Sequence, residues 1–289
     1  MDGSADLWVA LATRTLAEAR TRGRTSILGL CGPQGSGKST GAVAIQAAVE
    51  AAGGRAAVLS LDDLYLGKAE REALARTAHP LFATRGPPGT HDVALGLQVF
   101  DDLTRPGRVR LPRFDKASDD RAPVSTWPEV EAPVDVVIFE GWCVGARPQP
   151  TEALIRPMNA LEAAEDADGR WRAAVNGALG GAYQTLFGRI NLLVLLRPPA
   201  FEVVLGWRRQ QEHDLRARTG AGMSDDALVR FVQHYERLSR WIDHAGPSWS
   251  DIGVQLDAAR RVVDVRWDRP RPSTSSEAVT FSIPECDGS

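Results

Sequence analysis

Cysteine is scarce in this 289-residue chain, and its three copies, Cys31, Cys143 and Cys286, stand far apart without a CxxC pair. That argues against a disulfide framework and favours reduced thiols in the cytoplasm. The longest apolar run, at 190–196, is far too short to span a bilayer. The first residues are acidic where a signal peptide needs basic ones. We therefore expect a cytoplasmic protein that makes no use of a membrane.

An excess of charge of either sign is also lacking. The chain has 34 basic and 37 acidic residues, for a net charge of −3. A protein that binds nucleic acid by bulk electrostatics would normally carry a basic excess, so no nucleic-acid partner is expected. HExxH and GxSxG patterns are absent too, which leaves zinc hydrolysis and serine-triad chemistry without their usual signatures.

Lysine is almost absent: Lys38, Lys68 and Lys116 are the only three, so arginine supplies 31 of the 34 basic side chains. Arginine has replaced lysine almost everywhere that a generic positive charge would suffice. A lysine that remains is a candidate for a position that needs a compact ammonium group, where a planar guanidinium would not fit. Chance retention is the alternative for each of them.

Short apolar runs alternate with helical stretches along the chain. Buried strands are expected at 25–31, 55–61, 134–140 and 189–196, a short strand at 108–111 and a final strand at 261–267. Helices are expected at 6–22, 42–52, 93–103, 159–185, 200–218 and 224–243. This order predicts an α/β fold with a parallel sheet and helices on both of its faces.

The domain organisation follows from the absence of a linker between these strands. We expect an N-terminal helix at 1–24 and a single domain at 25–269. That domain would carry an insertion at about 146–190 and an arginine-bearing lid at about 207–226. A disordered tail is expected at 270–289, where serine and threonine cluster.

A glycine-rich segment between the first strand and the next helix matches GxxxxGK[ST]. In this context the pattern predicts a P-loop, whose backbone N–H groups and helix N-terminus bind the phosphates of a nucleotide such as ATP. Lys38 would contact the β- and γ-phosphates, and Ser39 would bind Mg²⁺. The expected nucleotide-binding residues are Gly32, Pro33, Gln34, Gly35, Ser36, Gly37, Lys38, Ser39 and Thr40.

Acidic residues end two further predicted strands, at the edge where a parallel sheet binds its ligand. Asp62 follows the second strand and is our candidate for the base that accepts a proton from an attacking hydroxyl. Glu140 ends the third strand, at the Walker B position, and is expected to bind Mg²⁺ with Ser39. A helix cap or turn is the alternative role for each acid.

Arginines occur where a lid would follow the fourth strand, at 208, 209, 216 and 218. An arginine there would neutralise charge on the transferring phosphoryl group, and we take Arg209 as the catalytic candidate. A solvated helix face is the alternative. Two charged loops, at 85–92 and 112–121, are candidates for reading the substrate.

With these residues in place, the chain resembles the plant and fungal D-glycerate 3-kinase family, which is related to phosphoribulokinase, uridine kinase and pantothenate kinase. The resemblance covers residues 28–243 in order. It rests on GPQGSGKST at 32–40, SLDDLYL at 60–66, RGPPGTHD at 85–92, PRFDKASDDRA at 112–122, STWPEVEAP at 125–133, VIFEGWCVG at 137–145 and GAGMSDD at 220–226. Two places depart from the family: residues 146–190, and Tyr235, which lacks the proline usual after that tyrosine.

The resemblance implies a P-loop kinase in which Asp62 is the general base, Lys38 and Ser39 are the phosphate and Mg²⁺ groups, and Glu140 is the Walker B acid. Asp92, Arg113 and Arg121 fall where relatives hold the acceptor. Our further candidates for binding the acceptor are Asp62, Tyr65, Arg85, His91 and Asp115. We therefore expect an enzyme that uses ATP and Mg²⁺ to phosphorylate a hydroxyl of a small hydroxy acid, foremost D-glycerate. The alternatives are a kinase for another polyol, nucleoside or pantothenate-like acceptor, and a nucleotide-binding regulatory ATPase.

Overall fold

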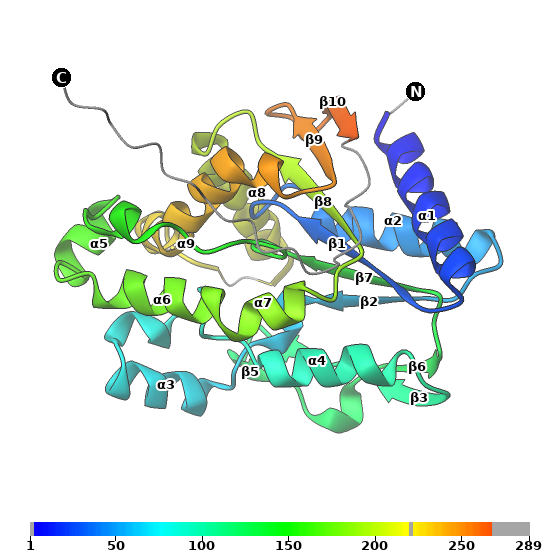
Figure 1. The fold of residues 1–289 in the computed structure, drawn as a ribbon. Coiled ribbons are helices and arrows are strands. Elements are labelled where there is room, and N and C mark those ends of the chain that lie inside the picture. Colours follow the sequence, from blue (N-terminus) through cyan, green and yellow to red (C-terminus); the bar gives the residue numbers. More distant parts are fainter. Residues whose placement is uncertain (1–2, 220–221, 268–289) are drawn as a thin grey trace, which may run out of the picture.

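A six-stranded sheet forms the centre of the computed structural model, which describes residues 3–219 and 222–267 (Figure 1). The strand order across the sheet is β10-β9-β8-β1-β7-β2. Five strands are parallel: β1 (Ser26–Cys31), β2 (Ala56–Ser60), β7 (Val136–Gly141), β8 (Leu192–Arg197) and β9 (Ile252–Leu256). The edge strand β10 (Val262–Trp267) runs antiparallel to β9.

The central strand β1 pairs with β7 on one side and β8 on the other, and all six of its residues are buried. Burial on both faces explains why its sequence reads as a continuous apolar run rather than an alternating one. Successive side chains still alternate between the faces, so Ile27 and Leu28 belong to two different hydrophobic clusters. The predicted α/β fold with a mainly parallel sheet is confirmed.

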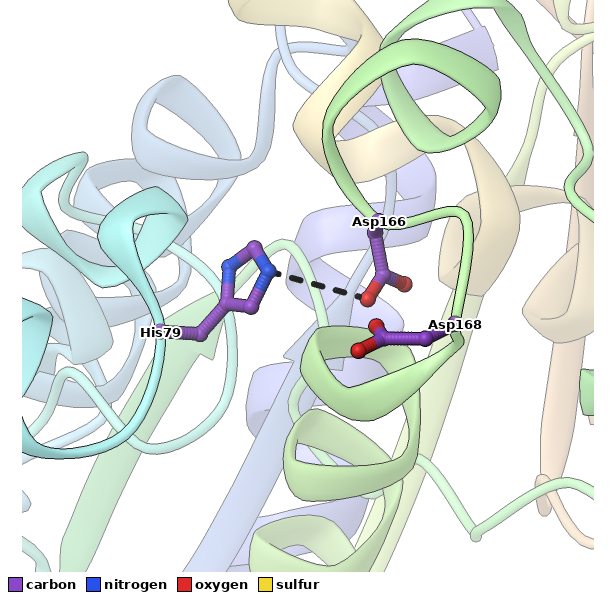
Figure 2. A group of neighbouring side chains, drawn as sticks. All are labelled: His79, Asp166 and Asp168. Atoms are coloured by element: carbon purple, nitrogen blue, oxygen red, sulfur yellow. Dashed lines mark ion pairs between the residues drawn. The ribbon is translucent and has the colours of Figure 1, made fainter.

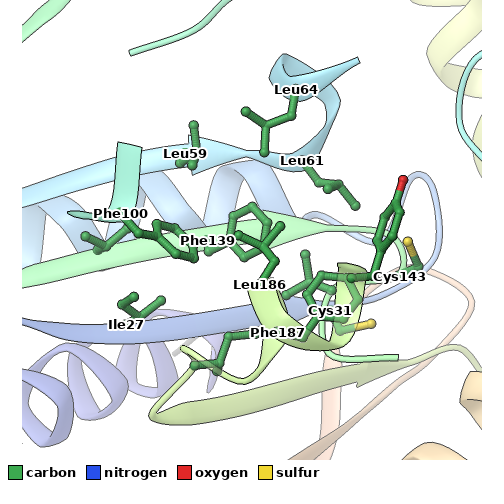
Figure 3. Close-up of a cluster of buried hydrophobic side chains, with 14 of the residues drawn as sticks. Ile27, Cys31, Leu59, Leu61, Leu64, Phe100, Phe139, Cys143, Leu186 and Phe187 are labelled. Carbon is green, nitrogen blue, oxygen red and sulfur yellow. The ribbon is translucent and has the colours of Figure 1, made fainter. Parts of the chain in front are cut away.

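Helices cover both faces of the sheet. On one face α1 (Gly3–Arg22), α2 (Lys38–Ala51) and the first turns of α8 (Glu202–Thr219) contribute to one cluster. On the other face α4 (Val93–Asp102), α7 (Ala182–Phe187) and α9 (Asp225–Ala245) enclose the cluster drawn in Figure 3. There Phe100 and Phe187 pack against the ring of Phe139. The N-terminal helix therefore shares a core with the P-loop helix.

The remaining helices and strands lie outside this sheet. They are α3 (Lys68–Thr77), α5 (Ala160–Glu165), α6 (Arg170–Gly180), the strand pair β3 (Gly107–Arg110) and β6 (Glu129–Ala132), and the strand pair β4 (Phe114–Asp115) and β5 (Asp120–Arg121). Among the described helices, none combines the length and hydrophobicity that crossing a bilayer requires.

Three expectations need correction. The sequence reading missed β9, a parallel strand whose run is interrupted by Gly253 and Gln255. No strand was expected within 112–133, but this segment contains three short strands that form backbone ladders with each other or with β3. The helical stretch at 159–185 is three helices, divided by Asp166 and by glycines at 180–181. The predicted tail at 270–289 lies outside the described residues.

Candidate active site

The segment from β1 to α2 has the conformation that a P-loop needs. Gly35 and Gly37 have φ values of 79° and 90°, a region that side chains disfavour. A Cβ on Gly35 would also lie 2.6 Å from Cβ of Trp207, at the start of α8. These two glycines turn the chain so that α2 begins at Lys38, with its N-terminus at the carboxyl edge of the sheet.

Two polar side chains of this loop are buried. Lys38 donates a hydrogen bond to the carbonyl oxygen of Pro33 at 3.1 Å. Ser36 is buried as well, and within the described chain no hydrogen-bond partner reaches its Oγ. Buried groups that stay unpaired are costly, so an unpaired donor beside a helix N-terminus fits a loop built for an anion.

Ser39 and Glu140 meet where β1 and β7 end. The register of these parallel strands pairs Cys31 with Gly141, which brings the start of α2 close to the end of β7. The hydroxyl of Ser39 donates to Oε1 of Glu140 at 3.0 Å, and Glu140 is 6% exposed. An alcohol and a carboxylate are hard oxygen donors, the kind that Mg²⁺ prefers, so these two residues fit the predicted metal site.

Asp62 and Asp63 lie in a single 3₁₀ turn, Leu61–Leu64, directly after β2. The Oγ of Ser60 caps this turn by accepting from the backbone N–H of Asp62, at 3.3 Å. Because β2 pairs with β7 so that Ser60 is opposite Glu140, the turn lies at the same edge as the Walker B acid. The predicted acids therefore come together at the carboxyl ends of neighbouring strands.

Both oxygens of Asp62 are hydrogen-bonded. Tyr65 donates to Oδ1 at 2.7 Å, and the ammonium group of Lys116 donates to Oδ2, also at 2.7 Å. Burial alone would raise the pKa of Asp62. The charge and hydrogen bond of Lys116, together with Tyr65 and the charge of Lys38, have the larger effect and hold that pKa well below its usual range. Asp62 is therefore a carboxylate held between a phenol and an ammonium group.

The hydrogen-bond partners of Asp63 differ from those of Asp62. It accepts from the backbone N–H of Phe114 at 3.1 Å and from the guanidinium of Arg113 at 3.3 Å. Burial raises its pKa, although Phe114 N–H and Arg113 act in the opposite direction. Asp63 thus anchors the β4–β5 hairpin beside Asp62, and this anchoring explains why two acids stand in succession.

Tyr65 and His91 form a buried stack. Their rings lie 4.7 Å apart, and the ring of Phe114 packs edge-on against Tyr65 at 5.2 Å. Nδ1 of His91 lies 2.6 Å from the hydroxyl of Tyr183, which also accepts from the N–H of Gly89. The bond to Tyr183 therefore fixes the orientation of the His91 ring.

Burial lowers the pKa of His91 to about 3, with the charge of Asp62 acting in the opposite direction. The ring is therefore neutral at physiological pH. Its Nε2 is buried, and no partner contacts it in the part of the chain that the structure describes. The predicted contact between His91 and the acceptor stays a prediction.

The predicted arginines of the acceptor loops are each paired with an acid. Arg121 contacts Asp92 at 3.1 Å, and Asp92 also caps α4. Arg85 pairs with Asp119, and its guanidinium lies over the ring of Phe114. These arginines border the same hairpin as Arg113, but each already balances a carboxylate.

Asp115 lies at the end of β4, next to Lys116. It is exposed, and its carboxylate accepts from the N–H of Ala117 and the hydroxyl of Ser118. These bonds, the hydroxyl of Ser118 first, lower its pKa. Asp115 therefore shapes the tip of the hairpin that carries Lys116, a role the sequence did not indicate.

The neighbouring lid arginines, Arg208 and Arg209, differ in exposure and in the residues that they contact. Arg208 is 18% exposed, pairs with Glu212, and lies with its guanidinium 5.5 Å from the ring centre of Phe231. Arg209 is half exposed and faces Asp225 at 3.7 Å. Because Arg208 is the less exposed of the two and packs against α9, it is a second candidate for the catalytic arginine, while the role predicted for Arg209 stays a prediction. The side chain of Arg218 and residues 220–221 lie outside the described part of the lid.

Gly86 fixes the loop at 85–92 over the site. Its φ is 122°, and a Cβ there would lie 1.9 Å from the hydroxyl oxygen of Tyr235. That hydroxyl donates to the carbonyl of Arg85 at 2.9 Å, and the indole of Trp142 donates to the carbonyl of Gly86 at 3.1 Å. The loop is therefore held by α9 and by the segment after β7 together.

Two residues at the site escaped the predicted set of functional residues. Lys116 contacts the candidate base, and the scarcity of lysine was the signal that could have found it. Tyr183 lies in the 146–190 segment and orients His91. No pattern in the sequence distinguishes it from a core tyrosine.

A second cluster of possible metal ligands consists of His79, which follows α3, and of Asp166 and Asp168, which lie between α5 and α6 (Figure 2). Nδ1 of His79 accepts from the N–H of Leu81, so the neutral ring carries its hydrogen on Nε2, facing Asp166 at 3.8 Å. Asp166 also accepts from backbone N–H groups at the start of α6 and from the guanidinium of Arg172. These bonds identify the cluster as the cap of α6.

Comparisons with known proteins agree with this geometry. The phosphoribulokinase / uridine kinase family matches residues 27–146. The uncharacterized kinase mug58 of Schizosaccharomyces pombe is 37% identical over 228 residues, 75% of this chain and 81% of that protein. The chloroplastic D-glycerate 3-kinase of Arabidopsis thaliana is 32% identical over 256 residues, 82% of this chain and 54% of that protein. The solved D-glycerate 3-kinase of Cryptococcus neoformans gives a TM-score of 0.77 at 27% identity, covering 91% of this chain and 98% of that one.

Proposed function

Since this chain belongs to the ATP-dependent small-molecule kinases related to D-glycerate 3-kinase, we propose that it phosphorylates a hydroxyl of a small hydroxy acid, namely D-glycerate, to give 3-phosphoglycerate. One observation carries the proposal: Asp62, at the end of β2, lies at the same sheet edge as the P-loop and the Ser39–Glu140 pair. A base at that place serves a hydroxyl acceptor.

The nucleotide is bound by residues 32–40. Backbone N–H groups at the start of α2 and the unpaired hydroxyl of Ser36 bind phosphate oxygens. The ammonium of Lys38 needs only to leave the carbonyl of Pro33 to contact the β- and γ-phosphates. Ser39 and Glu140 would hold Mg²⁺, which supplies positive charge to the phosphate oxygens when bound.

The transfer step needs a base and positive charge. The acceptor oxygen forms a bond to the γ-phosphorus, the bond from that phosphorus to the β–γ bridging oxygen breaks, and ADP leaves. The hydroxyl proton passes to Asp62, whose orientation is fixed by the buried Tyr65. Lys38 and Arg208 stabilise the charge that develops on the phosphoryl group.

D-glycerate is favoured as the acceptor by the cations around Asp62 as well as by the relatives. D-glycerate differs from glycerol chiefly by a carboxylate, and Lys116, Arg113 and Arg121 all come from the hairpin next to the base. Nε of Arg121 is buried, and no partner contacts it within residues 3–219 and 222–267. An unpaired buried donor here would bind the acceptor's carboxylate or a free hydroxyl.

A cytoplasmic location remains part of the proposal. It is supported by Cys31 and Cys143, which are buried free thiols. Burial, opposed by Lys38, raises the pKa of Cys31 to about 12, so this thiol is not poised to react.

The experiment that tests the acceptor is an ATP-dependent screen of small hydroxy acids, polyols, sugars and nucleosides, with ³¹P NMR of the product. We expect D-glycerate to exceed glycerol by about 10³ or more in kcat/KM, because glycerol has no carboxylate for the cations around Asp62 to bind. Arg113→Ala and Arg121→Ala should impair glycerate use far more than ATP binding. Equal use of glycerol or a nucleoside would refute the glycerate assignment and leave the kinase assignment intact.

A further inference from the structure

Asp62 has one fixed partner and one removable partner. Tyr65 is 2% exposed and is held between the rings of His91 and Phe114, so its hydrogen bond to Oδ1 is fixed. Lys116 is 61% exposed at the tip of the β4–β5 hairpin. Among the described residues, the only hydrogen-bond partner of its ammonium is Asp62. A ligand can therefore reach Lys116 without disturbing the core.

The hydrogen bond from Lys116 makes Asp62 a weaker base. A carboxylate that pairs with an ammonium group is stabilised in its charged form, so transfer of a proton to it costs the energy of that pair. The acceptor's proton can pass to Oδ2 at low cost only if Lys116 finds another anion. A carboxylate on the acceptor provides that anion, and glycerol does not.

The other cations near the hairpin are held more firmly. Arg85, Arg113 and Arg121 pair with Asp119, Asp63 and Asp92, and each has a further contact with a ring or a backbone carbonyl. Their side chains are 22%, 37% and 26% exposed. Lys116 is thus the most exposed of these cations and the only one of them that contacts Asp62.

We propose that Lys116 couples recognition of the acceptor's charge to release of the base: in the free enzyme it binds Asp62, and the carboxylate of a bound hydroxy acid takes its ammonium group over. This inference rests on the proposed function, because it assigns Asp62 as the base. Under this proposal the enzyme discriminates against a neutral acceptor through kcat as well as through binding, because Asp62 is still paired with Lys116 when such an acceptor is bound. A lysine suits this exchange because its single ammonium can move between two carboxylates, whereas the planar fork of an arginine favours one fixed partner.

The kinetic test compares Lys116→Met with a matched control, Lys68→Met, which removes another exposed lysine at the start of α3. For Lys116→Met we expect kcat/KM for D-glycerate to fall by about 10²-fold, the worth of a charge-assisted contact together with orientation of the acceptor. Its kcat for glycerol should stay equal or rise, and its KM for ATP should not change. Lys68→Met should match the wild type. An equal fall for both acceptors, or no fall for either, would overturn the proposal.

A second measurement does not depend on turnover. The chain has only three lysines, so ¹⁵N labelling of lysine gives three side-chain signals, and Lys116→Met identifies the one that matters. Asp62→Asn and saturating D-glycerate should both shift the Lys116 signal, whereas glycerol should leave it in place. If the enzyme phosphorylates D-glycerate but saturating D-glycerate does not shift the Lys116 signal, the proposed exchange is refuted.

The two proposals can fail separately. If the wild type phosphorylates another hydroxy acid and not D-glycerate, the acceptor assignment fails, and the same measurements with that acid and its neutral analogue decide the role of Lys116. If the wild type prefers a neutral acceptor, both proposals fail.

Discussion

Arg237 of α9 and Glu162 of α5 form an ion pair inside the protein. The guanidinium donates to both carboxylate oxygens, at 2.7 and 2.6 Å, and the two side chains are 9% and 0% exposed. Arg237 also donates to the carbonyls of Ala153 and Arg156. The Arg237–Glu162 pair therefore connects the two parts of the chain that depart from the family pattern, namely the 146–190 segment and the residues after Tyr235.

Breaking this pair from one side should be costly. Arg237→Met leaves the Glu162 carboxylate buried without its partner, and we expect the free energy of unfolding to fall by about 3–5 kcal/mol in urea titrations. The double variant Glu162→Leu with Arg237→Met should recover much of that loss. Arg230→Met, which breaks an exposed pair with Glu165, is the control and should cost at most about 1 kcal/mol. Strictly additive losses in the double variant would contradict a coupled pair.

Lys38 should be irreplaceable even by arginine. Lys38→Ala removes the positive charge from the β- and γ-phosphates in the transition state, so we expect kcat to fall by about 10²-fold or more. Lys38→Arg should also be poor, because the side chain is buried and a planar guanidinium does not fit inside the loop. Circular dichroism and steady-state kinetics check both variants. Near wild-type turnover of Lys38→Arg would show that lysine scarcity carries no functional meaning here.

Substitutions at the two acids should have different effects. Asp62→Asn should lower kcat by about 10²–10⁴, the usual contribution of a general base, while ATP affinity stays unchanged. Glu140→Gln should instead raise the Mg²⁺ concentration needed for half-maximal rate, because it weakens the oxygen donor beside Ser39. Rates across a Mg²⁺ titration separate the two. If Asp62→Asn abolished nucleotide binding and spared the rate of the bound complex, these roles would be reversed.

The neighbouring lid arginines offer a matched comparison. Arg208 lies against Phe231 and near Tyr235, whereas Arg209 faces outward to Asp225. We expect Arg208→Ala to lower kcat by about 10²-fold, as the loss of one group that stabilises transition-state charge usually does. Arg209→Ala should leave kcat nearly unchanged. A larger loss for Arg209→Ala in the same assay would restore it as the catalytic arginine.

The protonation of His91 should make the free energy of unfolding depend on pH. The unfolded chain protonates this histidine near its ordinary pKa of 6.5, and the folded chain only near 3. Between those values the unfolded state binds more protons, so the free energy of unfolding falls as pH is lowered from 7 toward 4.

His91→Phe keeps an aromatic ring against Tyr65 and removes the titration, so its unfolding free energy should fall less over that range. Urea titrations at several pH values measure the difference. His213→Gln, at an exposed position of α8, should follow the wild type. Parallel pH curves for wild type and His91→Phe would rule out the predicted contribution.

Much of the site could be predicted because it lies at the ends of strands. The P-loop, Asp62 and Glu140 each follow a short apolar run, and the carboxyl ends of parallel strands meet at one edge. Which of two adjacent arginines is the more buried could not be predicted, because the rotation of α8 is set by its packing against α9 and the P-loop. The pairing of Lys116 with Asp62 joins residues 54 positions apart through a hairpin that pattern alone left as loop.

The missed strand has a similar cause. Gly253 and Gln255 interrupt the apolar run of β9, so no local signal separates it from a loop. Its neighbour β8 and the antiparallel β10 supply the backbone partners that make it a strand. Tyr183 likewise gains its role only from the contact between the 146–190 segment and the loop at 85–92.

The position of β7 between β1 and β2 decides when the active site can exist during folding. Ser39 must find Glu140, 101 residues further along the chain, and β1 gains both of its neighbours only after β7 and β8 have been made. Pairings that close such long loops form slowly. A nascent chain that ends before Val136 has the P-loop and Asp62 without the strand that brings them together. Bound nucleotide can therefore stabilise the finished sheet, but it cannot guide the first steps of its assembly.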